Sequence, residues 1–143
     1  MKTSARNQFP GTVSKVTTGA VNDEIELDVL GGQKIVAIIT HESTKNLGLK
    51  AGVAAFALIK ASSIILVADD EGVKFSTRNR LSGTISKVLP GAVNTEVVID
   101  LPKGGAIASI ITNESAKSLG LAVGGTASAL FKASNVIVAV ATA

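Results

Sequence analysis

The sequence contains no cysteine, tryptophan or tyrosine, and its only aromatic residues are four phenylalanines. Without cysteine, the chain cannot form disulfides, thiolate metal sites or a cysteine nucleophile. So few aromatic rings argue against the base-stacking platforms that hold single-stranded nucleic acid. The single histidine, His41, cannot build a histidine-rich metal site and offers only one imidazole as a general base. These absences disfavour most metalloenzymes.

A large excess of charge of one sign is also absent. The chain of 143 residues has 14 basic and 11 acidic side chains, and they are scattered, so the net charge is only +3. This pattern lacks the basic stripe typical of nucleic-acid-binding surfaces. No apolar run is long enough to span a bilayer, and residues 1–7 lack the apolar region of a signal peptide. We therefore expect a cytoplasmic protein that binds neither nucleic acid nor membranes.

The chain is a tandem duplication. Displaced by 72 residues, the sequence matches itself without gaps at about half of its positions. An acidic stretch at 69–72 separates the copies, so we expect one module at 1–71 and a second at 72–143. The recurring motifs are Ser4-Ala5-Arg6-Asn7 with Ser76-Thr77-Arg78-Asn79, Gly19-Ala20-Val21-Asn22 with Gly91-Ala92-Val93-Asn94, Ile39-Thr40-His41-Glu42-Ser43 with Ile111-Thr112-Asn113-Glu114-Ser115, and Lys60-Ala61-Ser62 with Lys132-Ala133-Ser134.

The sequence of each copy predicts five short strands rich in β-branched residues. In the first copy these strands are expected at 12–16, 24–29, 35–40, 54–60 and 64–67. Between the third and fourth strands, Thr40 is a suitable N-cap for a short helix that ends at Gly48. This order predicts an all-β fold of two tandem OB-like five-stranded Greek-key barrels, each with one short helix. Because a copy of roughly 70 residues is marginally stable alone, we expect an obligate oligomer.

Polar side chains kept in both copies are the best candidates for a binding site. They donate hydrogen bonds and include no carboxylate, which suits a small oxyanion. One arginine and one lysine per copy supply +2, enough to neutralise a dianion, and without these four cations the chain would carry a net charge of −1. The candidates are Ser4, Arg6, Asn7, Thr40, Ser43, Lys60 and Ser62, with Ser76, Arg78, Asn79, Thr112, Ser115, Lys132 and Ser134.

Other interpretations remain open for these motifs. Taken singly, each could be only a strand start or a loop. Gly19-Ala20-Val21-Asn22 fits a hairpin turn with glycine at positive φ, or an anion-binding nest of backbone amides where subunits meet. Glu24 and Glu96, also repeated, are expected to be solvated or paired with a lysine, since acceptors would repel an anion. His41 is expected on the surface, because its counterpart is Asn113 and a shared activity cannot need its imidazole.

Together these motifs closely resemble the Mop module, the TOBE-type domain that binds molybdate and tungstate. Two modules in tandem resemble the cytoplasmic di-Mop molybdate-storage proteins of the ModG type. The resemblance implies OB-like modules in a ring of six, and hence a homotrimer with oxyanions between modules. It implies sites at Ser4, Arg6, Thr40, Ser43, Lys60, Ala61 and Ser62, and at Ser76, Arg78, Thr112, Ser115, Lys132, Ala133 and Ser134. Axial sites would lie near Gly19, Ala20, Val21, Asn22, Gly91, Ala92, Val93 and Asn94.

We therefore expect a protein that binds and stores molybdate or tungstate, with no organic cofactor and no directly coordinated cation. Sequence does not separate these two anions, since both are tetrahedral dianions of nearly equal size. The main alternative is an OB-fold protein that binds single-stranded nucleic acid. A small hydrolase ranks third because no general base is repeated, so we expect no enzymatic activity.

Overall fold

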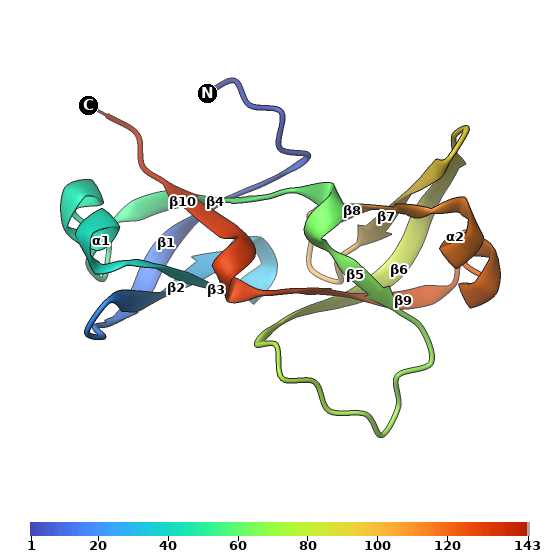
Figure 1. The fold of residues 1–143 in the computed structure, drawn as a ribbon, viewed down its shortest axis with the longest axis horizontal. Coiled ribbons are helices and arrows are strands. Elements are labelled where there is room, and N and C mark those ends of the chain that lie inside the picture. Colours follow the sequence, from blue (N-terminus) through green and yellow to red (C-terminus); the bar gives the residue numbers. More distant parts are fainter. Residues whose placement is uncertain (143) are drawn as a thin grey trace.

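The computed structural model describes residues 1–142, which form two five-stranded antiparallel barrels side by side (Figure 1). The predicted all-β fold with one short helix per copy is confirmed. The first barrel contains β1 (Asn7–Thr17), β2 (Asn22–Val29), β3 (Lys34–Thr40), α1 (His41–Leu47) and β4 (Ala54–Ile59). The second contains β6 (Asn79–Pro90), β7 (Asn94–Asp100), β8 (Ala106–Thr112), α2 (Asn113–Leu119) and β9 (Thr126–Phe131).

The fifth strand of each barrel comes from the other copy. β5 (Ile65–Val67) pairs with β9, and β10 (Val136–Ala139) pairs with β4, so the strand orders are β10-β4-β1-β2-β3 and β5-β9-β6-β7-β8. β10 also packs beside β3, and β5 beside β8, which closes the barrels. In Figure 1 the green β5 lies in the right-hand barrel and the red β10 in the left-hand one. Neither barrel is therefore complete without both copies.

Alternating side chains fill each barrel. In β2, Ile25 and Leu27 are fully buried while Glu24 and Glu26 lie partly exposed, as the sequence alternation predicts. Val97 and Ile99 of β7 are equally buried in the second barrel. The exchanged strands contribute as well, since Leu66 of β5 and Val138 of β10 belong to the buried core.

Two repeated glycines allow neighbouring strands to approach closely. A Cβ atom at Gly11 of β1 would lie 2.4 Å from the carbonyl oxygen of Asp28, and one at Gly83 of β6 would lie 2.0 Å from that of Asp100. Any larger residue would push these strands apart. This clearance explains why a glycine stands at the same place in both copies.

The two short helices have the predicted ends. Thr40 accepts a hydrogen bond from the Ser43 amide at 3.1 Å, which caps α1, and Gly48 ends the helix with φ of 64°. Thr112 and Gly120 perform the same roles for α2. Within residues 1–142, no helix has the length and apolar character needed to cross a membrane.

Candidate oxyanion site

One open pocket of about 570 Å³ collects most of the second copy's predicted donors. Its lining includes Ser76, Arg78, Lys132, Ala133 and Ser134, which come from the segment before β6 and the turn after β9. Residues far apart in the chain therefore meet on one surface. Hydroxyl, guanidinium and ammonium groups that converge in this way can donate several hydrogen bonds to one small anion.

Strand geometry positions the two segments of this pocket. The 3₁₀ turn η3 (Ala133–Asn135) follows β9 after Lys132. The Asn135 amide donates to the Lys132 carbonyl at 2.9 Å, which closes the turn around Ser134. Ile38 of β3 and Ile65 of β5 also line the pocket. Both copies therefore contribute to this pocket, and the candidate donors in it belong to the second copy.

A second pocket, of about 370 Å³, brings Ser62 of the first copy beside Thr112 and Ser115 of the second. Asn94 and Ile110 complete this wall, and Ile65 lies in both pockets, so the two adjoin. The Thr112 hydroxyl donates to the Ser115 hydroxyl at 2.8 Å, which leaves the hydrogen of Ser115 Oγ to point elsewhere. The chain therefore presents two partial donor sets rather than one closed site.

The first copy carries the same groups in the same local geometry. Ser4 and Arg6 lie exposed in the segment before β1, and Lys60 and Ser62 lie exposed around the 3₁₀ turn η2 (Ala61–Ser63). Thr40 and Ser43 repeat the hydroxyl pair of Thr112 and Ser115, again at 2.8 Å. Ala61 is buried and its methyl side chain has no donor, so its side chain cannot hydrogen-bond an anion.

Each candidate arginine is held by a glutamate of the other copy. Arg6 pairs with Glu96 of β7, and Arg78 pairs with Glu24 of β2. The hydrogen bond and charge of Glu96 raise the pKa of the Arg6 guanidinium. The expectation that the two glutamates are solvated or pair with lysine is wrong, because the barrels face each other and bring β2 and β7 beside the opposite arginine.

Asn7 and Asn79 are structural rather than available to an anion. Both are buried, and each side-chain amide imitates a strand partner across the junction of the barrels. Asn79 Oδ1 accepts from the Val36 amide and Nδ2 donates to the Val36 carbonyl, both at 2.8 Å. Asn7 makes the same two bonds with Ala108, also at 2.8 Å. These residues fix the backbone beside the arginines that precede them in sequence.

The Gly19–Asn22 and Gly91–Asn94 turns differ from the expected geometry. They join antiparallel strands, but neither Gly19 nor Gly91 has a positive φ. Glycine is required at Gly19 because a Cβ atom would lie 2.2 Å from the Asn22 carbonyl oxygen. The Gly19 amide already donates to Asp23 Oδ1 at 3.1 Å, and the Gly91 amide to the Asn94 carbonyl at 2.7 Å. These two amides are therefore engaged within the chain.

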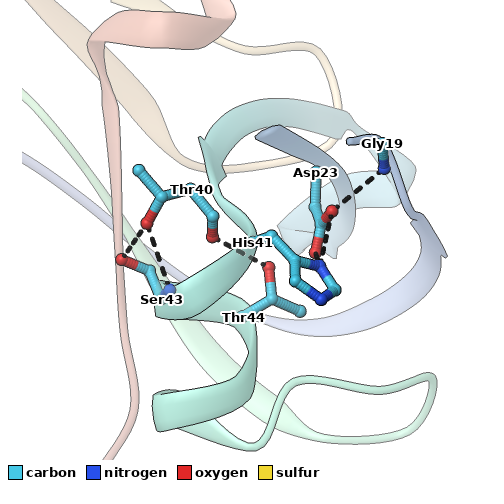
Figure 2. Close-up of polar contacts among 6 residues, drawn as sticks. All are labelled: Gly19, Asp23, Thr40, His41, Ser43 and Thr44. Atoms are coloured by element: carbon cyan, nitrogen blue, oxygen red, sulfur yellow. Dashed lines mark hydrogen bonds and ion pairs between the residues drawn. The ribbon is translucent and has the colours of Figure 1, made fainter. Parts of the chain in front are cut away.

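Beneath the first of these turns lies a buried carboxylate that sequence reasoning missed (Figure 2). Asp23 is fully buried at its side chain, and His41 Nδ1 lies 3.0 Å from its Oδ2, with the imidazole partly exposed. Burial alone would raise the pKa of the Asp23 carboxyl, but hydrogen bonds from Thr44, Gly19 and His41 outweigh it and hold the pKa below its ordinary value.

The second copy replaces this ionisable pair with a neutral one. Thr95 stands at the position of Asp23, and its hydroxyl donates to Asn113 Oδ1 at 2.6 Å. Asn113 occupies the position of His41, which in the first copy lies near the helix start as expected. The signal in the sequence was that both members of the pair differ together between the copies. Among residues 1–142, histidine and acidic side chains form no group of three or more that could hold a metal ion.

Comparison with protein families places the chain among TOBE proteins. The family model described as the TOBE domain matches residues 3–66 and, separately, residues 76–138. One match falls on each copy, and together they cover most of the chain. The chain therefore belongs to the TOBE domain family, as the motifs imply.

Relatives that are similar along nearly the whole chain carry molybdenum in their names. The molybdenum-pterin-binding protein MopA of Rhodobacter capsulatus is 48% identical over 97% of this chain and 52% of MopA. The molybdenum transport protein ModE of Herbaspirillum seropedicae is 46% identical over 98% of this chain and 52% of ModE. The chain thus spans about half the length of these curated relatives.

A solved structure matches the chain over its full length. It is the cytoplasmic molybdate-binding protein ModG with molybdate bound, which is 46% identical to this chain and superposes with a TM-score of 0.95. The match covers 99% of this chain and 100% of that one. At this level of identity and coverage, the two proteins share the arrangement of both barrels.

Proposed function

We propose that this chain binds molybdate, or the similar dianion tungstate, and stores it in the cytoplasm. The observation that carries the proposal is the pocket in which Ser76, Arg78, Lys132 and Ser134 converge. Support also comes from the similarity to a ModG structure that holds molybdate. The function is binding rather than catalysis, and the bound species is the oxyanion itself, with no organic cofactor.

The donor chemistry fits a tetrahedral dianion. Serine and threonine hydroxyls, one guanidinium and one ammonium group donate to its oxygens, and the two cations offset the cost of removing its charge from water. Phosphate should bind more weakly, since near neutral pH it is partly protonated and brings a donor into a site made mainly of donors. Sulfate has no such proton, so cavity size must exclude it from the site that a neighbouring chain completes.

A neighbouring subunit completes the site in this proposal. Each pocket is open and larger than a small tetrahedral anion requires, and the donors of the two pockets do not meet within one chain. Apolar side chains that are more than half exposed surround the junction and the turns, among them Ile65, Ile137, Val21 and Val93. Surfaces of this kind favour association. We infer a homotrimer in which the partial donor sets of adjacent chains combine.

The structure does not support the alternative function of binding single-stranded nucleic acid. Phe9 and Phe131 are buried in the barrel cores and cannot stack on bases. Phe75 lies partly buried, with the Arg80 guanidinium 5.6 Å from its ring centroid.

Paired substitutions test the proposed site through calorimetric titration with sodium molybdate. Arg6→Ala with Arg78→Ala should abolish most of the molybdate binding and leave the fold intact. An uncompensated anion charge costs several kcal/mol, and every 1.4 kcal/mol of binding free energy is about ten-fold in affinity. Lys60→Ala with Lys132→Ala should act similarly. The control, Lys15→Ala with Lys87→Ala, removes the same charge from exposed strand positions outside the pockets and should do little. Equal, modest losses in all three variants would show diffuse attraction and overturn the assigned roles.

A further inference from the structure

Both candidate arginines are already paired with a carboxylate side chain of the protein. Glu96 binds Arg6, and Glu24 binds Arg78, so the two pairs are reciprocal between the copies. The arginine side chains remain about half exposed, at 51% and 54%, whereas the glutamate side chains are only 19% and 33% exposed. Each guanidinium can therefore be reached from solvent while its carboxylate partner lies against the barrel.

The glutamates lie beside the proposed anion pockets. Glu24 of β2 is paired in register with Ile38 of β3, which lines the pocket of Arg78 and Lys132. Glu96 of β7 is paired with Ile110 of β8, which lines the pocket of Ser62, Thr112 and Ser115. The backbone beside each arginine is fixed by Asn7 or Asn79, so only the side chains need to move.

We infer that Glu24 and Glu96 compete with the oxyanion for the site arginines, so that binding is an exchange of one anion for another. This inference rests on the proposed molybdate-binding function. A carboxylate and a tetrahedral oxyanion are both acceptors for guanidinium N–H groups, and two anions held on one guanidinium repel each other. In this inference the carboxylate swings away when the oxyanion binds.

The exchange corrects the charge estimate made from the sequence. One arginine and one lysine give each site +2, but the paired glutamate lowers this to +1 before binding. Among residues 1–142, neither Lys60 nor Lys132 forms an ion pair, so the lysines keep their full charge for the incoming anion. A glutamate that stayed in place would also accept the proton of phosphate, so its departure is what preserves selectivity for a fully deprotonated dianion.

The test is calorimetric titration of the full chain with sodium molybdate, before and after Glu24→Gln with Glu96→Gln. The matched control is Asp28→Asn with Asp100→Asn, which removes the same charge from the same strands four residues farther along. At about 3.3 Å per residue, that places the control carboxylates roughly 13 Å away on the same face, beyond the Debye length at physiological salt. The glutamine variant should bind molybdate about ten-fold more tightly than the wild type. The affinity of the asparagine control should differ from that of the wild type by less than about two-fold.

Each outcome decides the inference. Competition is supported if the glutamine variant binds molybdate more tightly than the wild type and the asparagine control does not. It is also supported if the glutamine variant is the one protein of the three that binds molybdate. Unchanged or weaker binding beside a normal wild-type titration would overturn the inference and leave the proposed function standing, because the glutamates would then position the arginines rather than compete for them. If neither protein binds molybdate, the proposed function fails together with this inference. Because ion pairs whose cation is half exposed to solvent contribute little to folding, both variants should unfold like the wild type in urea.

Discussion

At the residue scale, Asn7 and Asn79 show that a repeated polar residue can serve the fold instead of a ligand. Each asparagine supplies one acceptor and one donor to the backbone of the opposite barrel. Sequence repetition selects these residues together with Arg6 and Arg78, but it cannot show which of the side chains are buried. Burial separates them, since both asparagines are buried and both arginines are exposed.

We predict that Asn79→Ala lowers the free energy of unfolding by about 1 to 3 kcal/mol, because it leaves the buried amide and carbonyl of Val36 without partners. Urea denaturation would measure the loss. Asn46→Ala, at an exposed position of α1, removes the same side chain without breaking such bonds and serves as the control. Equal stabilities for the two variants would show that the junction does not depend on this side chain.

The Asp23 and His41 pair predicts that the first barrel is sensitive to acid. Because hydrogen bonds hold the folded-state pKa of Asp23 below its ordinary value, the carboxylate stabilises the fold fully above about pH 4. That contribution is lost as the pH falls through the folded-state value. The double variant Asp23→Thr with His41→Asn copies the neutral pair of the second barrel, so its unfolding free energy should change less between pH 5 and pH 3. Identical acid sensitivity, measured by urea denaturation at both pH values, would count against this account.

At the scale of elements, local pattern predicts the strands well but not their partners. The strand starting at Glu24 and the helix between Thr40 and Gly48 were expected nearly as they occur. β1 starts at Asn7, five residues earlier than predicted, because Pro10 and Gly11 resemble a turn yet lie in register with Phe56 and Ala55 of β4. The exchange of β5 and β10 is invisible locally, since both strands have similar apolar sequences and fit either barrel.

The exchange itself can be tested with neighbouring residues of β10. Val138 is buried against the first barrel, whereas Ile137 is 64% exposed. Val138→Asp should lower stability by several kcal/mol, because it buries a charge, and should speed hydrogen exchange at the amides of β4 in the other copy. Ile137→Asp should change exchange in β4 far less. Faster exchange confined to β9 after the Val138 substitution would show that each copy closes its own barrel.

At the scale of the whole molecule, the proposed function requires association between chains. The two partial donor sets lie in adjoining pockets of one chain, and exposed apolar residues flank them. Sequence could predict the donors from their repetition but not their grouping, because the grouping depends on the exchanged strands. The glutamates that hold the arginines were likewise unpredictable, since Glu24 and Glu96 come near Arg78 and Arg6 only when the two barrels pack together.

Analytical ultracentrifugation tests the oligomer directly. At micromolar concentration the protein should sediment as one species of three times the chain mass, because sites formed between chains need the neighbour. Ile65→Lys with Ile137→Lys, which places charge on the exposed apolar surface, should shift the protein toward monomers. A wild-type protein that stays monomeric would contradict the trimer while leaving binding within a single chain open to measurement.

The most direct test of the central claim is competitive calorimetry of the wild-type protein with molybdate, tungstate, sulfate and phosphate at one pH and one salt concentration. Molybdate and tungstate should bind with similar, high affinity, while sulfate and phosphate should bind weakly and fail to displace them, because the donor set is matched to a large, fully deprotonated tetrahedral dianion. An absence of molybdate binding, or phosphate binding of equal strength, would contradict the proposed function.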